Sequence, residues 1–253
     1  MYEKLKKIAG KLKNGEDLTL DFVGDSVTHG LNHCSSDETY TAVFASLMAE
    51  HFKEYSVFRY DGIPTGGLAP MGSFAGPFPV SIGNGRGRMD IIRNGIGGNT
   101  VARAYNRIAD FAGTAANGKI PDITFMMFGI NDALKPDPAK YVTADVFKQN
   151  YGKLIDEVIH RIPDTCVILL TATTNDWTVD EHCQKTVDLA AERGIPLIDT
   201  HRLWEEHYDA GAGNFGHGDW LAGGSDACHP TPVGARATAK FIFDEFIKVF
   251  SYE

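Results

Sequence analysis

The amino-acid sequence predicts an α/β fold in which helices cover both faces of a mostly parallel sheet. Two observations lead to this class. Short runs of successive apolar residues are typical of strands that are buried on both faces, and amphipathic stretches with helical spacing lie between most of these runs. Because strands and helices alternate along the chain, we expect parallel strands joined by right-handed crossovers.

Five apolar runs are predicted to be the strands of this sheet. Several are apolar at successive positions rather than at alternate ones, so neither face of these strands is expected to meet water. The predicted strands are Leu18–Val23, Met89–Ile92, Ile123–Phe128, Cys166–Leu170 and Ile195–Ile198.

Three longer patterns repeat apolar residues at intervals of three and four, so each is predicted to be a helix with one face against the sheet. Asp37 is the predicted N-cap of the first helix. The last helix is predicted to begin with Thr231 as its cap and Pro232 in its first turn. In chain order, the apolar positions are Tyr40, Val43, Phe44, Leu47 and Met48; Phe147, Tyr151, Leu154, Ile155 and Val158; and Phe241, Ile242, Phe246 and Ile247.

The length of 253 residues fits one large α/β domain, and we expect residues 1–253 to form one. The segment from about 55 to 88 interrupts the alternation because it is rich in glycine and proline. Val57–Tyr60 fits a small strand, and the rest of this segment is predicted to be an inserted surface loop.

Charge and apolar content bound the partners and the location of the protein. Lys and Arg number 24 against 33 Asp and Glu, and the net charge of -9 argues against nucleic acid as a partner. The longest apolar run, Ile123–Ile130, is too short to span a membrane. No export signal is visible at the N-terminus, which favours a cytoplasmic location, although secretion stays open if a leader has been trimmed.

The N-terminal segment spaces Leu5, Ile8 and Leu12 along one side of a short helix among lysines. A helix that packs beside the first strand explains this pattern, and a helix at a membrane surface is the alternative.

The cysteines show no regular metal-ligand spacing, so thiols are expected. Two alternatives stay open: a disulfide between Cys34 and Cys228, and a metal site built from His29, His33 and Cys34. The four cysteines are Cys34, Cys166, Cys183 and Cys228.

The turn that follows the first predicted strand carries a candidate nucleophile. In open parallel sheets, ligands bind beyond the carboxyl ends of the strands, so residues at these ends are the ones to inspect. Ser26 stands at the strand tip within Gly24–Gly30. Gly-Asp-Ser is also an ordinary turn sequence, so this segment alone does not identify a site.

Two further turns offer hydrogen-bond donors at the same edge. The turn Asn94–Thr100 precedes a helical pattern, and backbone N–H groups near Gly98 suit an anion. Its glycine spacing matches neither the Walker pattern nor GxGxxG, and a flexible turn is the alternative. Asn131 follows the next strand and offers a side-chain amide, although Asn-Asp is also a common helix cap.

Asp226 and His229 precede the last predicted helix. A carboxylate at this spacing can fix the imidazole tautomer, so that the other ring nitrogen acts as a base, while a surface or capping histidine is the alternative. Together with the serine and the two donor turns, this pair completes a nucleophile, a base, an orienting acid and oxyanion donors.

These four segments resemble the sequence blocks of the SGNH hydrolase superfamily, also called GDSL-type esterases. The blocks appear in the family's order from Gly24 to His229, including the Gly-Ile-Asn-Asp segment at 129–132. The resemblance implies a three-layer α/β/α sandwich, flavodoxin-like, around about five mostly parallel strands. Val27 stands where leucine is frequent in the family, and Asn99 stands where aspartate is common; neither change removes a catalytic atom.

The resemblance also implies the role of each site residue in a metal-free and cofactor-free reaction. The implied catalytic triad is Ser26, Asp226 and His229, and the implied oxyanion hole is formed by Ser26, Gly98 and Asn131.

The predicted function is a serine esterase that forms an acyl-enzyme on Ser26. No long apolar lid is visible near the blocks, which favours short acyl groups, especially acetyl esters on carbohydrate. A lipolytic esterase or lysophospholipase of the same superfamily is the alternative. Trp177, Trp220 and His29 are predicted to contact substrate, although the tryptophans could equally anchor loops. A noncatalytic flavodoxin-like binding module is the alternative from another class, but it gives no reason for the Asp-His pair.

Overall fold

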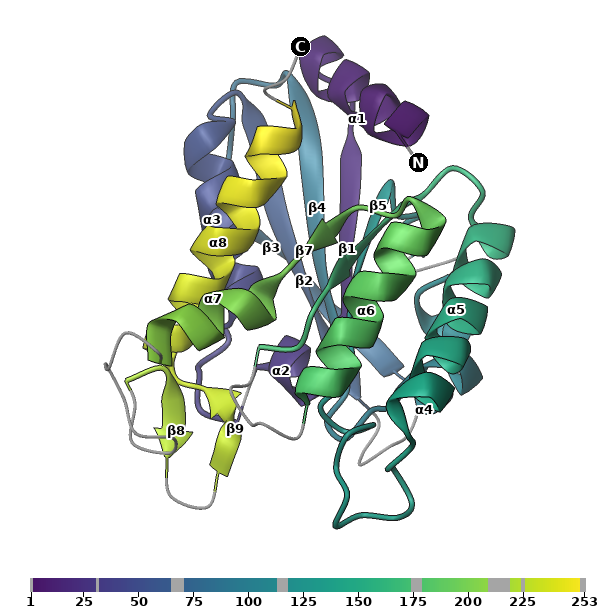
Figure 1. Ribbon diagram of the computed structural model, residues 1–253. Coiled ribbons are helices and arrows are strands. Elements are labelled where there is room, and N and C mark those ends of the chain that lie inside the picture. Colours follow the sequence, from purple (N-terminus) through teal and green to yellow (C-terminus); the bar gives the residue numbers. More distant parts are fainter. Residues whose placement is uncertain are drawn as a thin grey trace.

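The computed structural model describes residues 2–30, 32–64, 71–112, 118–173, 179–208, 219–223 and 226–250. A seven-stranded sheet with the order β3-β2-β4-β1-β5-β6-β7 runs through its centre, and a two-stranded ribbon pairs β8 with β9 (Figure 1). The strands are β1 (Leu18–Gly24), β2 (Tyr55–Pro64), β3 (Met71–Ser81), β4 (Gly87–Gly95), β5 (Ile123–Met127), β6 (Cys166–Leu170), β7 (Leu197–Ile198), β8 (Leu221–Gly223) and β9 (Asp226–Pro230).

Helices cover both faces of the large sheet, as the alternating pattern predicts. The helices are α1 (Tyr2–Asn14), α2 (Ser26–His29), α3 (Tyr40–His51), α4 (Val101–Asn106), the 3-10 turn η1 (Ile108–Asp110), α5 (Ala144–Arg161), α6 (Asp180–Arg193), α7 (Thr200–His207) and α8 (Pro232–Phe250).

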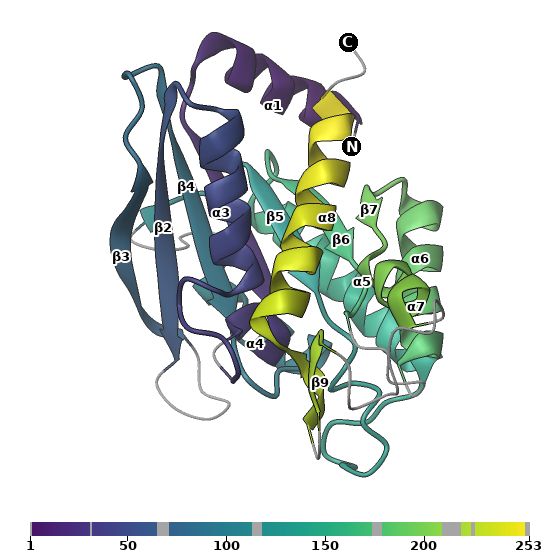
Figure 2. The ribbon, with the colours of Figure 1, turned by 90° about the vertical axis from the view of Figure 1, so that its left-hand side faces the viewer.

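Two hydrophobic cores lie on opposite faces of the sheet. Strand β5 shows the division, because Phe125 belongs to the core under α1, α3 and α8, whereas Met126 belongs to the core under α4, α5 and α6. In the first core, the Phe22 and Phe125 rings are stacked with their centroids 4.4 Å apart. The predicted sandwich of three layers is therefore confirmed (Figure 2).

All five predicted strands are present and parallel, in the spatial order β4-β1-β5-β6-β7. The predicted strand Val57–Tyr60 is confirmed within β2, but the surface loop predicted for the rest of 55–88 is wrong, because the longer β2 pairs parallel with β4 and β3 pairs antiparallel with β2. Strand β3 lies at the edge of the sheet, where prolines are tolerated since one side needs no N–H donor. Register shifts between β2 and β3 absorb the remaining irregularity.

The helix predictions hold for α5 and α8 but not for the start of α3. The Thr231 hydroxyl accepts from the Gly234 N–H at 3.3 Å and thus caps α8 as predicted. Asp37 is not the cap of α3. Thr39 is, since its hydroxyl accepts from the Ala42 N–H at 3.3 Å. The Asp37 carboxylate is instead 2.8 Å from the Arg59 guanidinium, and this ion pair explains the difference.

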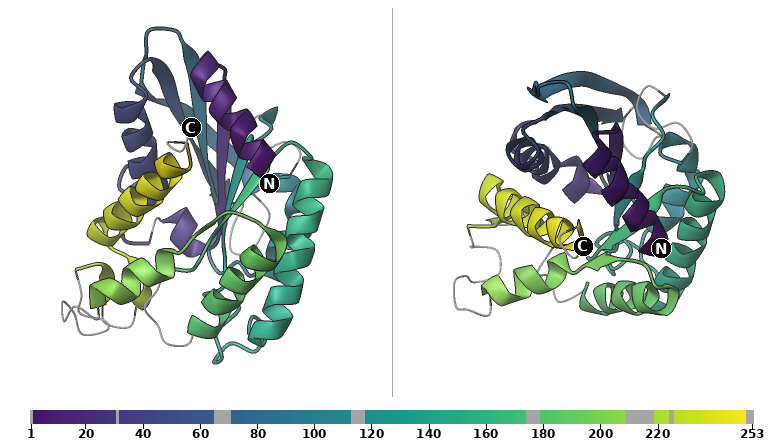
Figure 3. Two further views of the ribbon diagram at one scale, coloured as in Figure 1. Left: turned by 45° about the horizontal axis from the view of Figure 1, so that its top comes forward. Right: turned by 90° about the horizontal axis from the view of Figure 1, so that it is seen from above.

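The apolar side of α1 packs into the core. Ile8 and Leu12 are buried, and Leu5 packs against the same cluster. Helix α1 contacts the C-terminal helix α8, which is yellow in Figure 3. This side is therefore used inside the fold rather than at a membrane surface. None of the helices in the described part of the chain has the length and apolar character that a membrane span requires.

Candidate active site

The segments singled out in the sequence meet at the carboxyl edge of the parallel strands. Helix α2 begins at Ser26, two residues beyond the end of β1, and β9 approaches it from the two-stranded ribbon (Figure 1). The turns that follow β4 and β5 lie beside β1, because both strands pair with it in parallel. This is the edge at which open parallel sheets bind ligands.

The Ser26 hydroxyl contacts the His229 imidazole. The Ser26 Oγ and His229 Nε2 atoms are 2.8 Å apart, and the Ser26 side chain is buried. His229 Nδ1 lies 3.5 Å from the Cys228 sulfur. When Nδ1 carries the ring proton, Nε2 accepts from the hydroxyl, which is the arrangement of a base and its nucleophile.

The strand ribbon and α8 fix the position of His229. Leu221 of β8 pairs with Pro230 of β9, and the Thr231 N–H donates to the Trp220 carbonyl at 2.8 Å. Asp226 is the first residue of β9, but its side chain lies outside the described residues. Its part as the acid that orients His229 therefore stays a prediction.

Local hydrogen bonds and a close backbone approach hold α2. The Asp25 carboxylate caps the helix by accepting from the Val27 N–H at 2.9 Å. The helix rests directly on Gly95 at the end of β4, where an added Cβ would lie 2.1 Å from the His29 backbone nitrogen. A residue larger than glycine at this position would push the helix, and Ser26 with it, away from the sheet.

The turn after β4 and the turn after β5 carry hydrogen-bond donors at the edge of the sheet where Ser26 lies. Gly98 has a φ of +72°, which favours glycine, and the Asn99 N–H closes the turn on the Ile96 carbonyl at 3.2 Å. Within the described residues, neither the Ser26 N–H nor the Gly98 N–H donates to an acceptor. The Asn131 amide nitrogen lies 3.5 Å from the Asp25 carboxylate.

Two buried carboxyl groups lie next to these donors. Burial raises the pKa of Asp25 to about 7, against smaller lowering effects from the Val27 N–H and the Asn131 amide. Burial also raises the pKa of Asp132 to about 7, and the neighbouring Asp25 charge adds to the rise. The Asp132 carboxylate accepts from the Val101 N–H at 3.1 Å and so ties the start of α4 to the turn after β5.

The buried Arg107 guanidinium links the ends of β1 and β4 to the turn that follows β4. Arg107 donates to the Gly24 carbonyl and the Asn94 carbonyl, both at 3.2 Å, and to the Asn94 side-chain oxygen at 2.9 Å. With the Asn99 amide turned so that its oxygen faces Arg107, that oxygen accepts from Nε at 2.7 Å. Arg107 thus joins the ends of β1 and β4 to the turn that carries Gly98. This role could not be predicted from the sequence, because one arginine in a helical pattern has no distinguishing spacing.

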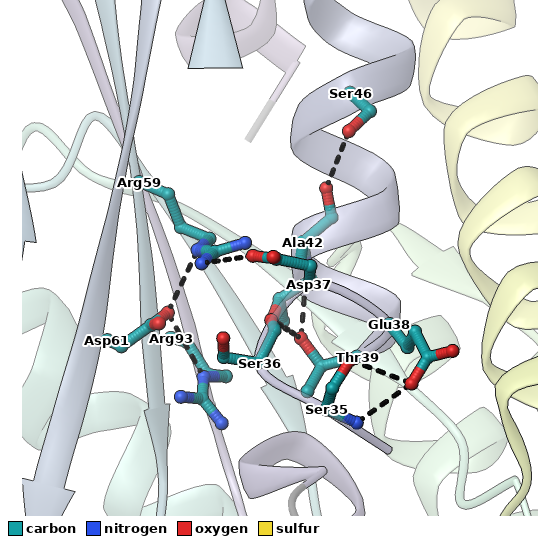
Figure 4. Close-up of polar contacts among 11 residues, drawn as sticks. Ser35, Ser36, Asp37, Glu38, Thr39, Ala42, Ser46, Arg59, Asp61 and Arg93 are labelled. Carbon is teal, nitrogen blue, oxygen red and sulfur yellow. Dashed lines mark hydrogen bonds and ion pairs between the residues drawn. The ribbon is translucent and has the colours of Figure 1, made fainter. Parts of the chain in front are cut away.

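A second cluster of charges fastens α2 and the segment before α3 to the neighbouring strands (Figure 4). Asp61 on β2 lies 3.2 Å from Arg59 and 3.3 Å from Arg93, and the three side chains are largely buried. Arg59 also reaches Asp37 at 2.8 Å, and Arg93 donates to the His29 carbonyl. Both ends of the loop that leads from α2 to α3 are therefore held by the sheet.

The three residues that were predicted to contact substrate, His29, Trp220 and Trp177, lie in different surroundings. The His29 ring is half-buried at the end of α2, and its burial lowers the pKa of the imidazole. The Trp220 ring stacks on His207 at 3.7 Å between centroids and contacts Trp204, so it packs as a loop anchor would. Trp177 lies outside the described residues. Contact of any of the three with substrate stays a prediction.

One candidate was not predicted as a substrate contact. The His33 ring lies 6.2 Å from the His229 ring, and only its sequence distance of seven residues from Ser26 could have pointed to it. The alternative disulfide is wrong, because Cys34 and Cys228 are both thiols and the Cys34 sulfur faces the Pro230 carbonyl at 3.7 Å. The alternative metal site of His29, His33 and Cys34 is also wrong, since their ligand atoms do not converge in the described part of the chain.

Comparison with known proteins decides the family. The model of the GDSL-like lipase/acylhydrolase family matches residues 65–237, which is more than half of the chain. The chain belongs to this family. Membership of a lipase/acylhydrolase family favours an ester hydrolase over the noncatalytic binding module. The Gly24–Gly30 block lies before the matched range. No curated protein sequence matches the chain.

Solved structures of esterases share the fold of this GDSL-like hydrolase. A two-domain esterase active on acetylated mannans has 19% identity and a TM-score of 0.66, over 99% of this chain and 54% of that one. A peptidoglycan O-acetylesterase has 13% identity and a TM-score of 0.67, over 99% and 96%. A catalytic mutant of an acetylxylan esterase from Geobacillus stearothermophilus has 18% identity and a TM-score of 0.58, over 93% and 95%. The chain thus spans about half of the mannan esterase, and these identities establish the fold alone.

The buried network predicts a pH-dependent stability. Asp21 is a buried residue of β1 whose carboxyl interacts with Asn94 and Arg107. Burial raises the pKa of this carboxyl to about 8, against the lowering effects of these two side chains. Because the unfolded chain ionises near 3.8 and the folded chain only near 8, Asp21 stabilises the fold fully below the lower value, and this contribution is lost as pH rises to the higher value.

Asp21→Asn removes this titration. Relative to the variant, the wild type should lose more than about 1 kcal/mol of unfolding free energy between about pH 5 and about pH 8. Urea denaturation of both proteins across this range measures the difference. Parallel stability curves would contradict the assigned shift.

Proposed function

We propose that the protein hydrolyses short-chain acyl esters, in particular acetyl esters on carbohydrate, through an acyl-enzyme on Ser26. The observation that carries the proposal is the 2.8 Å contact between Ser26 Oγ and His229 Nε2 at the carboxyl edge of the sheet. In the first step, Oγ attacks the ester carbonyl carbon while Nε2 takes the hydroxyl proton. The same proton then passes to the leaving alcohol, and the acyl group stays on Ser26.

Water completes the reaction by the same route. His229 takes a proton from the water, the oxygen attacks the acyl carbon, and Ser26 regains its proton as the acid departs. In this proposal, Asp226 orients the imidazole through Nδ1, as the Asp-His spacing predicts.

Three donors are proposed to stabilise the negative charge on the carbonyl oxygen. Two are the Ser26 and Gly98 N–H groups, which have no acceptor among the described residues, and the third is the Asn131 amide. Such donors lower the barrier because they interact more strongly with the oxyanion than with the neutral ester. The raised pKa of Asp25 and of Asp132 also supports this arrangement, since neutral carboxyl groups oppose an oxyanion less than charged ones do.

Two observations support a polar substrate with a short acyl group. Polar side chains lie close to the Ser26–His229 pair, with the His33 ring 6.2 Å from the His229 ring and the Asn131 amide beside Asp25. The three structures with the same fold described above are named for acetylated mannan, peptidoglycan O-acetyl groups and acetylxylan. A lipolytic esterase or lysophospholipase with the same site is the alternative and differs in the acyl chain that it accepts.

Ser26→Ala should abolish ester hydrolysis without unfolding the protein, because the change removes only the nucleophilic oxygen. Hydrolysis of 4-nitrophenyl acetate and the circular dichroism spectrum are measured for both proteins. Covalent labelling of the wild type by a fluorophosphonate, absent in the variant, tests the nucleophile directly. Full turnover by a folded Ser26→Ala variant would contradict the mechanism.

The acyl preference is tested by kcat/KM on 4-nitrophenyl esters of increasing chain length and by acetate release from acetylated xylan, mannan and simple sugars. Acetate esters should be preferred over long-chain esters by at least about tenfold, a margin that a few methylene contacts can provide. A preference for long chains would favour the lipolytic alternative and leave the role of Ser26 intact.

Asn131→Ala should lower kcat by about 10²- to 10³-fold with little change in KM, the usual effect of losing one oxyanion donor. Steady-state kinetics on an acetate ester measure both constants. Asn150→Ala on α5 is the control for an asparagine outside the site. A rise in KM with unchanged kcat would make Asn131 a substrate-binding residue instead.

A further inference from the structure

Three side chains with metal-ligand chemistry converge away from Ser26, where α6 and α7 meet. Asp180 is the first residue of α6, and His201 and Glu205 lie one turn apart on α7. His201 Nε2 is 3.1 Å from an Asp180 carboxylate oxygen and 3.6 Å from a Glu205 carboxylate oxygen. One ligand atom from each residue lies within 4.8 Å of the other two.

The surroundings of this cluster favour a cation. A cavity of about 350 Å³ opens beside it, and the described residues that line it include four carboxylates but no lysine or arginine. Two of the four carboxylates belong to the cluster, and the others are Glu181 and Asp199. Carboxylates gathered without a basic side chain repel one another, and a bound cation relieves this repulsion.

The His201 ring turns one nitrogen, Nε2, toward both carboxylates. A neutral imidazole carries at most one proton on Nε2, which serves the oxygen at 3.1 Å but leaves the second carboxylate at 3.6 Å without a donor. Nδ1 of the same ring is buried and points away from the two carboxylates, and it carries the ring proton when Nε2 binds a cation. His201 is only 5% exposed, whereas the Asp180 and Glu205 side chains are about half exposed.

The spacing of the ligand atoms fits a divalent metal. Zinc binds imidazole nitrogen and carboxylate oxygen at about 2.0–2.2 Å, so tetrahedral ligands stand about 3.3 Å from one another. The two distances from His201 Nε2 to the carboxylate oxygens, 3.1 and 3.6 Å, lie on either side of this value. One imidazole and two carboxylates are also a ligand set that zinc accepts, with water from the cavity at the remaining position.

We propose that Asp180, His201 and Glu205 bind one Zn²⁺ ion that joins the start of α6 to α7. None of the three residues belongs to the Ser26 mechanism, so the ion is structural and the ester hydrolysis does not depend on it. Since the ligands come from two helices, the folded protein binds the ion and the unfolded chain does not hold the three atoms together. Zinc should therefore raise the unfolding temperature.

The test compares Glu205→Gln with its neighbour Glu206→Gln. Both side chains lie on α7 and are more than half exposed, so both variants should fold, but the Glu206 carboxylate pairs with Arg202 at 3.5 Å instead of facing His201. Metal-free protein is titrated with ZnCl₂ by calorimetry, and the unfolding temperature is measured with and without zinc.

The wild type and Glu206→Gln should each bind one ion at this site and gain thermal stability. Glu205→Gln should bind the ion at least about tenfold more weakly. Loss of a residue that only hydrogen-bonds to a metal ligand already lowers metal affinity by about this factor, and Glu205 is proposed as a ligand itself. Asp180→Asn should behave as Glu205→Gln does, and hydrolysis of an acetate ester should be unchanged in both variants.

Two results would overturn the proposal. One is the absence of zinc binding by the wild type. The other is equal affinity and equal stabilisation in Glu205→Gln and Glu206→Gln, which would place any bound zinc on other groups, such as the thiols. Neither result bears on Ser26, because the activity measurements are independent of the titration.

Discussion

The arrangement of the site depends on the buried Arg107 guanidinium. Its hydrogen bonds reach the Gly24 carbonyl before the serine turn, Asn94 at the end of β4 and the Asn99 amide beside Gly98. Burial lowers the pKa of Arg107 to about 10, so the group remains charged at neutral pH. A buried charge is stable only while its donors are satisfied, and here the acceptors lie on the segments that lead to Ser26 and Gly98 of the proposed site. The same bonds that stabilise the cation therefore align the strand ends.

Two buried carboxyl groups also hold backbone segments of the site in place. Asp25 and Asp132 are buried, and each accepts a hydrogen bond from the main chain at the start of a helix. Each carboxyl group thus positions a backbone segment, while burial raises its pKa towards neutrality and reduces its negative charge. The burial of these two carboxyl groups therefore has two effects: it anchors the backbone, and it reduces the negative charge that would oppose an oxyanion at the proposed site.

The sequence predicted what depends on local patterns and missed what depends on tertiary partners. Apolar runs located β1, β4, β5, β6 and β7, because a strand covered on both faces must be apolar throughout. Strand β3 was missed since its prolines and glycines are tolerated only by its place at the edge, which no local signal reveals. Asp37 and Thr39 are both good caps, and Arg59, twenty or more residues away, decides between them. The motifs indicated Ser26 and His229, and their 2.8 Å contact was expected from the family resemblance. Arg107 carries no motif and could not be found in this way.

Both edge strands of the large sheet, β7 and β3, have features that bear on how the protein behaves at high concentration. Strand β7 has only two residues, and β3 carries Pro77 and Pro79 along a mostly exposed strand with an irregular register. An edge that is very short, or that lacks N–H donors and is bent, offers a poor template for a strand from another molecule. The prolines that prevented the prediction of β3 from the sequence thus protect this edge against edge-to-edge aggregation.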